Sequence, residues 1–151
     1  MSKRQIVALL ALLGLLIAIY LTLYKTGAIA ELACSVGSCE TVQMSRWATF
    51  LGLPVAAWGV AFYVVLLALS LAGLQGSLAD SRVVSVGLVA LTGWGVTFSA
   101  WLTYLELFVI HAICQWCVVS AILVTIAFVI AWLDLRERPR AGSTLGAPES
   151  T

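Results

Sequence analysis

The chain has 151 residues, a formal net charge of +1, 62% hydrophobic residues and 10% charged residues, and its mean hydropathy is +1.08. Soluble globular domains average about 45–50% apolar and about 25% charged residues, so a water-soluble fold is excluded. The composition indicates an integral membrane protein with one domain. The partner it predicts is a lipid bilayer, and we expect no nucleic-acid partner.

Four uncharged stretches are long enough to cross a membrane, which takes about 20 helical residues. They cover residues 6–24, 54–74, 83–105 and 112–133. The first resembles a signal peptide because Lys3 and Arg4 precede it. It is longer than the usual apolar region of about 7–15 residues, however, and no clear cleavage site follows. We predict an all-α, four-transmembrane-helix bundle over residues 1–135, with an external cap of loop and half-helix in residues 25–53.

Basic residues indicate how the bundle sits in the membrane. If the N-terminus is cytoplasmic, six Lys and Arg residues lie on the inner side, and two, Lys25 and Arg46, lie on the outer side. Short cytoplasmic loops carry the excess of positive charge, so both termini are predicted to be cytoplasmic. Residues 136–151 are mostly small and polar without a pattern, and we expect them to form a disordered cytoplasmic tail.

The four cysteines form two closely spaced pairs. Cys34 and Cys39 lie in the stretch ELACSVGSCE of the first external loop, and Cys114 and Cys117 begin the last apolar stretch. The predicted orientation places all four on the oxidising side of the membrane. A C-x-x-C pair at a helix N-terminus lies on one helical face, where the helix dipole favours a thiolate. Because the thiolate attacks in disulfide exchange, the sequence predicts a reactive dithiol at the membrane edge.

Three other interpretations of these cysteines remain open. They could form two structural disulfides in a membrane scaffold, although a helix start is a strained place for one. They could bind zinc as two short-spaced pairs, although the first spacing is C-x4-C and no soluble subdomain surrounds it. They could also be inert buried thiols. We favour redox chemistry and predict no metal.

Two ionisable residues lie near the C-x-x-C pair. His111 is the sole histidine, three residues before Cys114. It could stabilise a thiolate or relay a proton, or it could be a solvated turn residue. Glu106 follows the third apolar stretch, and we expect it to be a solvated cap or turn residue.

Several short motifs occur in a specific order along the chain. The order is CSVGSC in the first loop, SRW at 45–47, GLPVAAWGVAFY at 52–63 and CQWC at the start of the last helix. This order resembles the vitamin K epoxide reductase family in its bacterial branch, over roughly residues 6–133. In the DsbB type of four-span thiol oxidase, the C-x-x-C pair comes first instead. The resemblance implies a bacterial inner-membrane homologue without a fused thioredoxin domain.

The resemblance implies an electron relay. Cys34 would react first with a periplasmic thioredoxin-fold protein of the DsbA type, and Cys39 would form a transient disulfide with Cys114. Cys117 would be the thiolate next to a quinone, which could be ubiquinone or menaquinone. The implied function is a quinone-dependent thiol oxidase that reoxidises the periplasmic partner.

The resemblance also suggests residues around the quinone. Ser45 matches a functional Ser/Thr, whose hydroxyl could donate to a quinone carbonyl or could cap a helix over 45–52. Trp58 and Trp116 flank the elements expected to enclose the quinone, and His111 and Ala121 are further candidates. Trp116 could instead face lipid, because it is about 100° from Cys117 around the helix.

Two positions depart from the vertebrate members of the family. Ala121 stands where those enzymes carry an aromatic hydroxyl, and Val55 stands approximately where they carry an amide. Neither can make the corresponding hydrogen bond, which argues against epoxide reduction and leaves disulfide exchange unaffected. The alternative activity is reduction of a quinone or vitamin K epoxide by thiol donors.

Overall fold

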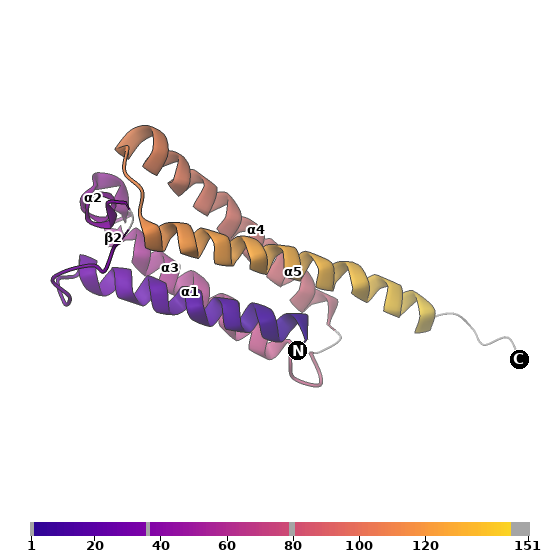
Figure 1. Ribbon diagram of the computed structural model, residues 1–151. Helices are drawn as coiled ribbons and strands as arrows, with labels where there is room; N and C mark the ends of the chain where they lie inside the picture. Colours follow the sequence, from indigo (N-terminus) through magenta and orange to yellow (C-terminus); the bar gives the residue numbers. More distant parts are fainter. Residues whose placement is uncertain (1, 36, 79–80, 146–151) are drawn as a thin grey trace, which may run out of the picture.

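Four long helices form a bundle in the computed structural model, which describes residues 2–35, 37–78 and 81–145 (Figure 1). They are α1 (Lys3–Lys25), α3 (Val55–Ala72), α4 (Arg82–Tyr104) and α5 (Gln115–Leu145). Helix α1 packs on α3 and α5, and α4 packs on the same two helices, so the four close a ring. Each contains a segment long and apolar enough to cross a membrane. The predicted all-α, four-helix membrane architecture is confirmed.

A small cap covers the end of the bundle where α1 ends and α5 begins (Figure 1). It contains α2 (Cys39–Met44), the 3-10 turn η1 (Arg46–Ala48) and a hairpin of β1 (Thr49–Phe50) and β2 (Leu53–Pro54). Leu51 and Gly52 both have positive φ, the conformation that a tight two-residue hairpin requires. The Lys25 ammonium donates to the Gln43 carbonyl over 2.6 Å and ties α1 to α2.

Two helices extend beyond their predicted ends. Helix α4 continues into the π-helical turn η2 (Leu105–Ile110). Helix α5 continues to Leu145, although residues 136–151 were expected to be disordered, so that expectation is wrong for residues 136–145. The end of an apolar stretch marks the end of the lipid contact, and Arg, Glu, Ala and Leu are good helix formers in water. Residues 146–151 lie outside the described part of the chain.

The helices pack through small side chains and point large apolar ones outward. Gly14 lies so close to the Tyr63 ring that a Cβ would overlap it, and Gly95 faces Phe62 in the same way. Large outward side chains include Leu16, of which 56% is exposed. Lipid is as apolar as leucine, so membrane helices associate through close contact at small residues. The exposed apolar surface is therefore the lipid-facing one.

A buried arginine joins the helices at the end opposite the cap. The Arg4 side chain is only 2% exposed, and its Nε donates to Asp134 Oδ2 over 3.3 Å. Its other nitrogens donate to the Gly73 carbonyl at 2.6 Å and the Ser85 hydroxyl at 2.9 Å. Further bonds reach the carbonyls of Leu78 and Ser81. One guanidinium thus fastens α1, the α3–α4 connection, α4 and α5 together.

We expect Asp134→Ala to lower the free energy of unfolding by about 3–5 kcal/mol, because it leaves the buried Arg4 charge without its carboxylate. The matched control is Glu137→Ala, which removes the exposed Lys3–Glu137 pair. It should change the same quantity by less than about 1 kcal/mol. Denaturation in detergent micelles measures both variants, and equal effects would contradict the assigned role of Arg4.

Candidate active site

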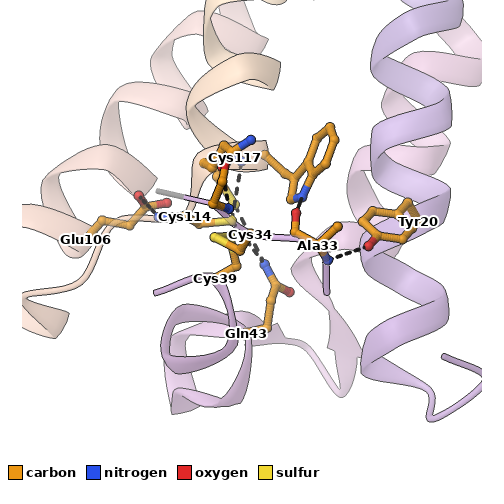
Figure 2. Close-up of a disulfide and its surroundings, with 11 residues drawn as sticks. Tyr20, Ala33, Cys34, Cys39, Gln43, Glu106, Cys114 and Cys117 are labelled. Carbon is orange, nitrogen blue, oxygen red and sulfur yellow. Dashed lines mark hydrogen bonds between the residues drawn. A yellow bond between two sulfur atoms is a disulfide. The ribbon is translucent and has the colours of Figure 1, made fainter. Parts of the chain in front are cut away.

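A disulfide and a dithiol meet beneath the cap (Figure 2). Cys34 and Cys39 are joined by a disulfide, while Cys114 and Cys117 are free thiols. Cys34 is half-buried, whereas Cys39 and Cys114 are fully enclosed in one apolar cluster that Cys117 packs against. The fold therefore brings together all four cysteines identified in the sequence.

Backbone hydrogen bonds hold the disulfide loop against the start of α5. Gly37 forms an antiparallel bridge with Cys114, and the Ser38 N–H donates to the Ile113 carbonyl over 2.8 Å. Gly37 has a φ of +84°, and a Cβ there would overlap the Ile113 carbonyl oxygen. A glycine is required because other residues neither adopt this conformation readily nor fit beneath that carbonyl.

Trp116 anchors the same loop from the other side. Its indole N–H donates to the Ala33 carbonyl over 2.8 Å, and the Ala33 N–H donates to the Tyr20 hydroxyl over 2.8 Å. The Tyr20 and Trp116 rings pack edge to face, with centroids 5.5 Å apart. Gln115 accepts hydrogen bonds from the Ser35 N–H and hydroxyl. The loop is thus fixed to both α1 and α5.

Cys114 caps the N-terminus of α5 with its sulfur. The Cys117 N–H donates to Cys114 Sγ over 3.4 Å, the contact that a serine oxygen makes in an ordinary N-cap. The Cys117 side chain, the Cys117 N–H and the Gln43 amide all bond to the Cys114 sulfur, and they lower the pKa of its thiol against the opposing effect of burial. The resemblance implied a thiolate at Cys117, whereas this helix start stabilises one at Cys114.

An apolar cavity of about 560 Å³ lies between the four long helices and the cap. Cys117 lines it, and Cys114 is not among its lining residues. Apolar side chains make up most of the wall, and Gln43, Ser45, Glu106 and Ser120 are among its polar members. Its size and lining suit a small apolar molecule that is held by few polar contacts. The two thiols therefore have different surroundings, since one faces the disulfide loop and the other faces the cavity.

Two of the expected quinone contacts lie on this cavity. Ser45 and Trp58 both line it. The Ser45 hydroxyl donates to the Val42 carbonyl over 2.8 Å, so it closes the end of α2 and does not cap the turn that follows. The Trp58 indole N–H donates to the Phe50 carbonyl over 3.0 Å and holds the hairpin on α3. Their role towards a quinone stays a prediction.

The other three candidates do not line the cavity. His111 is exposed and ends the π-helical turn with a φ of 58°. Trp116 contacts the loop, as described above. Ala121 lies on a shallow hollow beside α4, shared with Thr103 and Ile122. Helical spacing relative to Cys117 does not reveal which face of α5 the neighbouring helices cover. The sequence alone therefore could not distinguish these three positions from residues that line the cavity.

Two polar residues that the sequence analysis did not assign to the site complete it. Gln43 is buried, and its amide nitrogen lies 3.7 Å from Cys117 Sγ and 3.9 Å from Cys114 Sγ. Glu106 is 4% exposed, so the expectation of a solvated residue is wrong. A sequence signal existed for Glu106, which is the sole charged residue in 83–133. A charge within an apolar span usually marks a functional position. Gln43 carried no comparable signal.

These features define a class of protein. A disulfide in contact with a buried dithiol, which opens on an apolar cavity between membrane-spanning helices, is the site of a membrane thiol–disulfide oxidoreductase. Within the described ranges, no group of three or more His, Cys, Asp or Glu residues is placed to hold a metal ion.

A family model described as the vitamin K epoxide reductase family matches residues 5–132, and the chain belongs to this family. Family members are oxidoreductases that act on thiols and use a quinone. The match covers the four-helix bundle, the cap and all four cysteines.

We expect Gln43→Leu to raise the pH at which the Cys114 thiolate forms. The Gln43 amide donates to the Cys114 sulfur and lowers the pKa of this thiol. Without that donor the pKa rises, so the thiolate fraction falls at any pH below the new midpoint. Alkylation of Cys114 against pH, followed by peptide mass spectrometry in a Cys34→Ala/Cys39→Ala background, measures the midpoint. Thr41→Leu, at an exposed position of α2, is the control, and an unshifted midpoint in Gln43→Leu contradicts the assignment.

Proposed function

We propose that the protein is a quinone-dependent thiol oxidase that reoxidises a periplasmic thioredoxin-fold protein of the DsbA type. The observation that carries this proposal is the position of the C-x-x-C pair. Cys114 is buried against the disulfide loop, and Cys117 lines the apolar cavity. A dithiol between a disulfide and a cavity suited to a lipid-soluble molecule can pass electrons from one to the other.

The burial of each cysteine supports a fixed order of exchange. Cys34 is the more exposed member of the loop disulfide, so a thiolate of the partner attacks its sulfur and releases Cys39. The partner's second thiolate then attacks the partner sulfur of this mixed disulfide and expels Cys34, which leaves an oxidised partner and a reduced loop. In the return half of the cycle, Cys39 attacks the Cys114–Cys117 disulfide at Cys114, and Cys34 then resolves the Cys39–Cys114 bond. The loop disulfide is restored and the C-x-x-C pair is reduced.

The quinone closes the cycle. Oxidation of Cys114 and Cys117 to a disulfide releases two electrons and two protons, and a quinone takes up both to become a quinol. The cavity supports ubiquinone or menaquinone as the acceptor, since Cys117 faces a mainly apolar wall with a few hydrogen-bonding groups. Quinones are in general stronger oxidants than protein disulfides, so electrons flow from the dithiol to the quinone.

The distribution of basic residues supports the side on which this chemistry takes place. The cysteine end carries Lys25 and Arg46, whereas the opposite end carries Lys3, Arg4, Arg82 and Arg136. By the positive-inside rule, the cysteine end faces the periplasm of a bacterial inner membrane and the N-terminus lies in the cytoplasm. Two free thiols packed against a disulfide support exchange chemistry over a scaffold with purely structural bridges. Val55 lines the cavity and offers no side-chain amide to an epoxide substrate.

We expect Cys117→Ala to abolish quinone reduction, because the thiol that lines the cavity is lost. The double variant Cys34→Ala/Cys117→Ala should accumulate a Cys39–Cys114 disulfide, because neither thiol that could resolve it remains. Cys114→Ala should still form the Cys34–Cys39 disulfide but should not regenerate it with quinone. The measurement is anaerobic quinone reduction by pre-reduced protein, followed by absorbance, with disulfides mapped by mass spectrometry. Fully pre-reduced wild type should reduce about two quinones per chain, since its two cysteine pairs hold four electrons and each quinone takes up two. Normal turnover in Cys114→Ala would disprove this relay.

We expect a membrane-impermeant maleimide to label Thr26→Cys in intact cells and to label Ser2→Cys only after permeabilisation. Both cysteines are placed in an otherwise cysteine-free chain. Thr26 follows α1 at the cysteine end, and Ser2 precedes α1 at the opposite end. The reverse labelling pattern would place the cysteines in the cytoplasm and exclude a periplasmic partner.

A further inference from the structure

Glu106 lies beside Cys114 (Figure 2) and is part of the cavity wall. Its carboxylate oxygen accepts the Cys114 N–H over 3.1 Å, and its side chain lies close to the Cys117 thiol. The same residue lines the cavity that Cys117 faces. It is 4% exposed and lies within a membrane-spanning segment. An acid in this environment is costly and marks a proton path more often than a structural contact.

The π-helical turn sets the position of Glu106. Both the His111 and the Ala112 N–H donate to the Glu106 carbonyl. Such turns are rare and occur frequently at functional sites, because the extra residue rotates the side chains that follow or precede it. Here the turn follows α4 directly and places the Glu106 side chain beside Cys114 and Cys117. The π-helical turn thus places a buried carboxyl group beside two thiols.

We propose that Glu106 is a catalytic residue that transfers the proton of the Cys117 thiol to the quinone bound in the cavity. This inference rests on the proposed function and adds a residue to it. Glu106 lies close to the reacting sulfur and lines the same cavity, which is the placement that general acid–base catalysis requires.

The proton and electron balance defines the step. The Glu106 carboxylate takes the Cys117 proton, and the Cys117 sulfur forms a bond to a ring carbon of the quinone. Glu106 then gives this proton to one quinone oxygen. The Cys114 thiolate attacks the Cys117 sulfur, which forms the disulfide and breaks the sulfur–carbon bond, and the electron pair stays on the ring. The second quinone oxygen takes a proton from water, which replaces the proton that Cys114 released to water on ionising.

A structural role of Glu106 makes a different prediction. As a structural residue, it would only hold the Cys114 N–H and thereby fix the start of α5. An amide oxygen of glutamine accepts that N–H equally well, whereas aspartate is one methylene shorter and cannot reach it from the same backbone. Glutamine cannot transfer a proton, and aspartate can. The two substitutions therefore separate proton transfer from positioning.

The experiment measures single-turnover reduction of short-chain ubiquinone and of menadione by pre-reduced protein. We expect Glu106→Gln to lower the maximal rate at least about 100-fold, the lower end of what an acid–base group contributes. The half-saturating quinone concentration should not change. Glu106→Asp should retain more activity than Glu106→Gln. The control is Glu31→Gln, at an exposed acid of the same end of the bundle, which should react at the wild-type rate.

Each outcome decides between the two roles. A wild-type rate in Glu106→Gln, or activity in Glu106→Gln above that in Glu106→Asp, contradicts proton transfer by Glu106. The unfolding midpoint and the rate at which dithiothreitol reduces the Cys34–Cys39 disulfide establish that each variant is folded. If Glu106→Gln does not fold, loss of all activity in a folded Glu106→Asp overturns the proposal. If wild type reduces neither quinone, the proposed function itself fails, which is a separate result.

Discussion

The redox site depends on the backbone bridge between Gly37 and Cys114. This bridge, with the bond from Ser38 to the Ile113 carbonyl, holds a loop disulfide against the first turn of the last helix. Disulfide exchange needs sulfur atoms in contact, and a loop alone would leave them free to separate. Trp116 and Gln115 fasten the same loop through side chains. The chain therefore holds its two redox pairs together mainly with hydrogen bonds of the loop itself.

The two ends of the bundle are held in different ways. At the N-terminal end, the buried Arg4 guanidinium joins three helices and the α3–α4 connection through charge-assisted bonds, which are the stronger kind. At the cysteine end, the disulfide loop is fixed by neutral contacts such as those of Ser38, Trp116 and Tyr20, and α2 has one charged bond from Lys25. A thiol-exchange site has to let sulfur atoms change partners, and neutral bonds are the easier ones to break and re-form.

Cys114 and Cys117 have different surroundings. This difference explains how one C-x-x-C motif can exchange with the loop disulfide and also face the cavity. Helical spacing puts the two residues on one face of α5, but the first caps the helix and the second lies inside the bundle. The cap position gives Cys114 the N–H bonds that lower its pKa, and the interior position gives Cys117 the wall of the cavity. Gln43 reaches both thiols, whereas Glu106 accepts the Cys114 N–H and lines the cavity with Cys117. The two thiols differ because the start of α5 lies between the disulfide loop and the interior of the bundle.

The sequence by itself determined the membrane class, the four spans and the pairing of cysteines at one end, because apolar length and residue order are local properties. It also indicated Ser45 and Trp58 as candidate quinone contacts, and both line the cavity. Only the tertiary structure decided that His111, Trp116 and Ala121 lie off that cavity, and that Glu106 and Gln43 lie on it or against the thiols. The reason is physical: the burial of a side chain depends on which neighbouring helix covers its face. In an apolar chain the pattern of hydrophobic residues carries little of that information, since lipid-facing and core-facing positions are equally apolar.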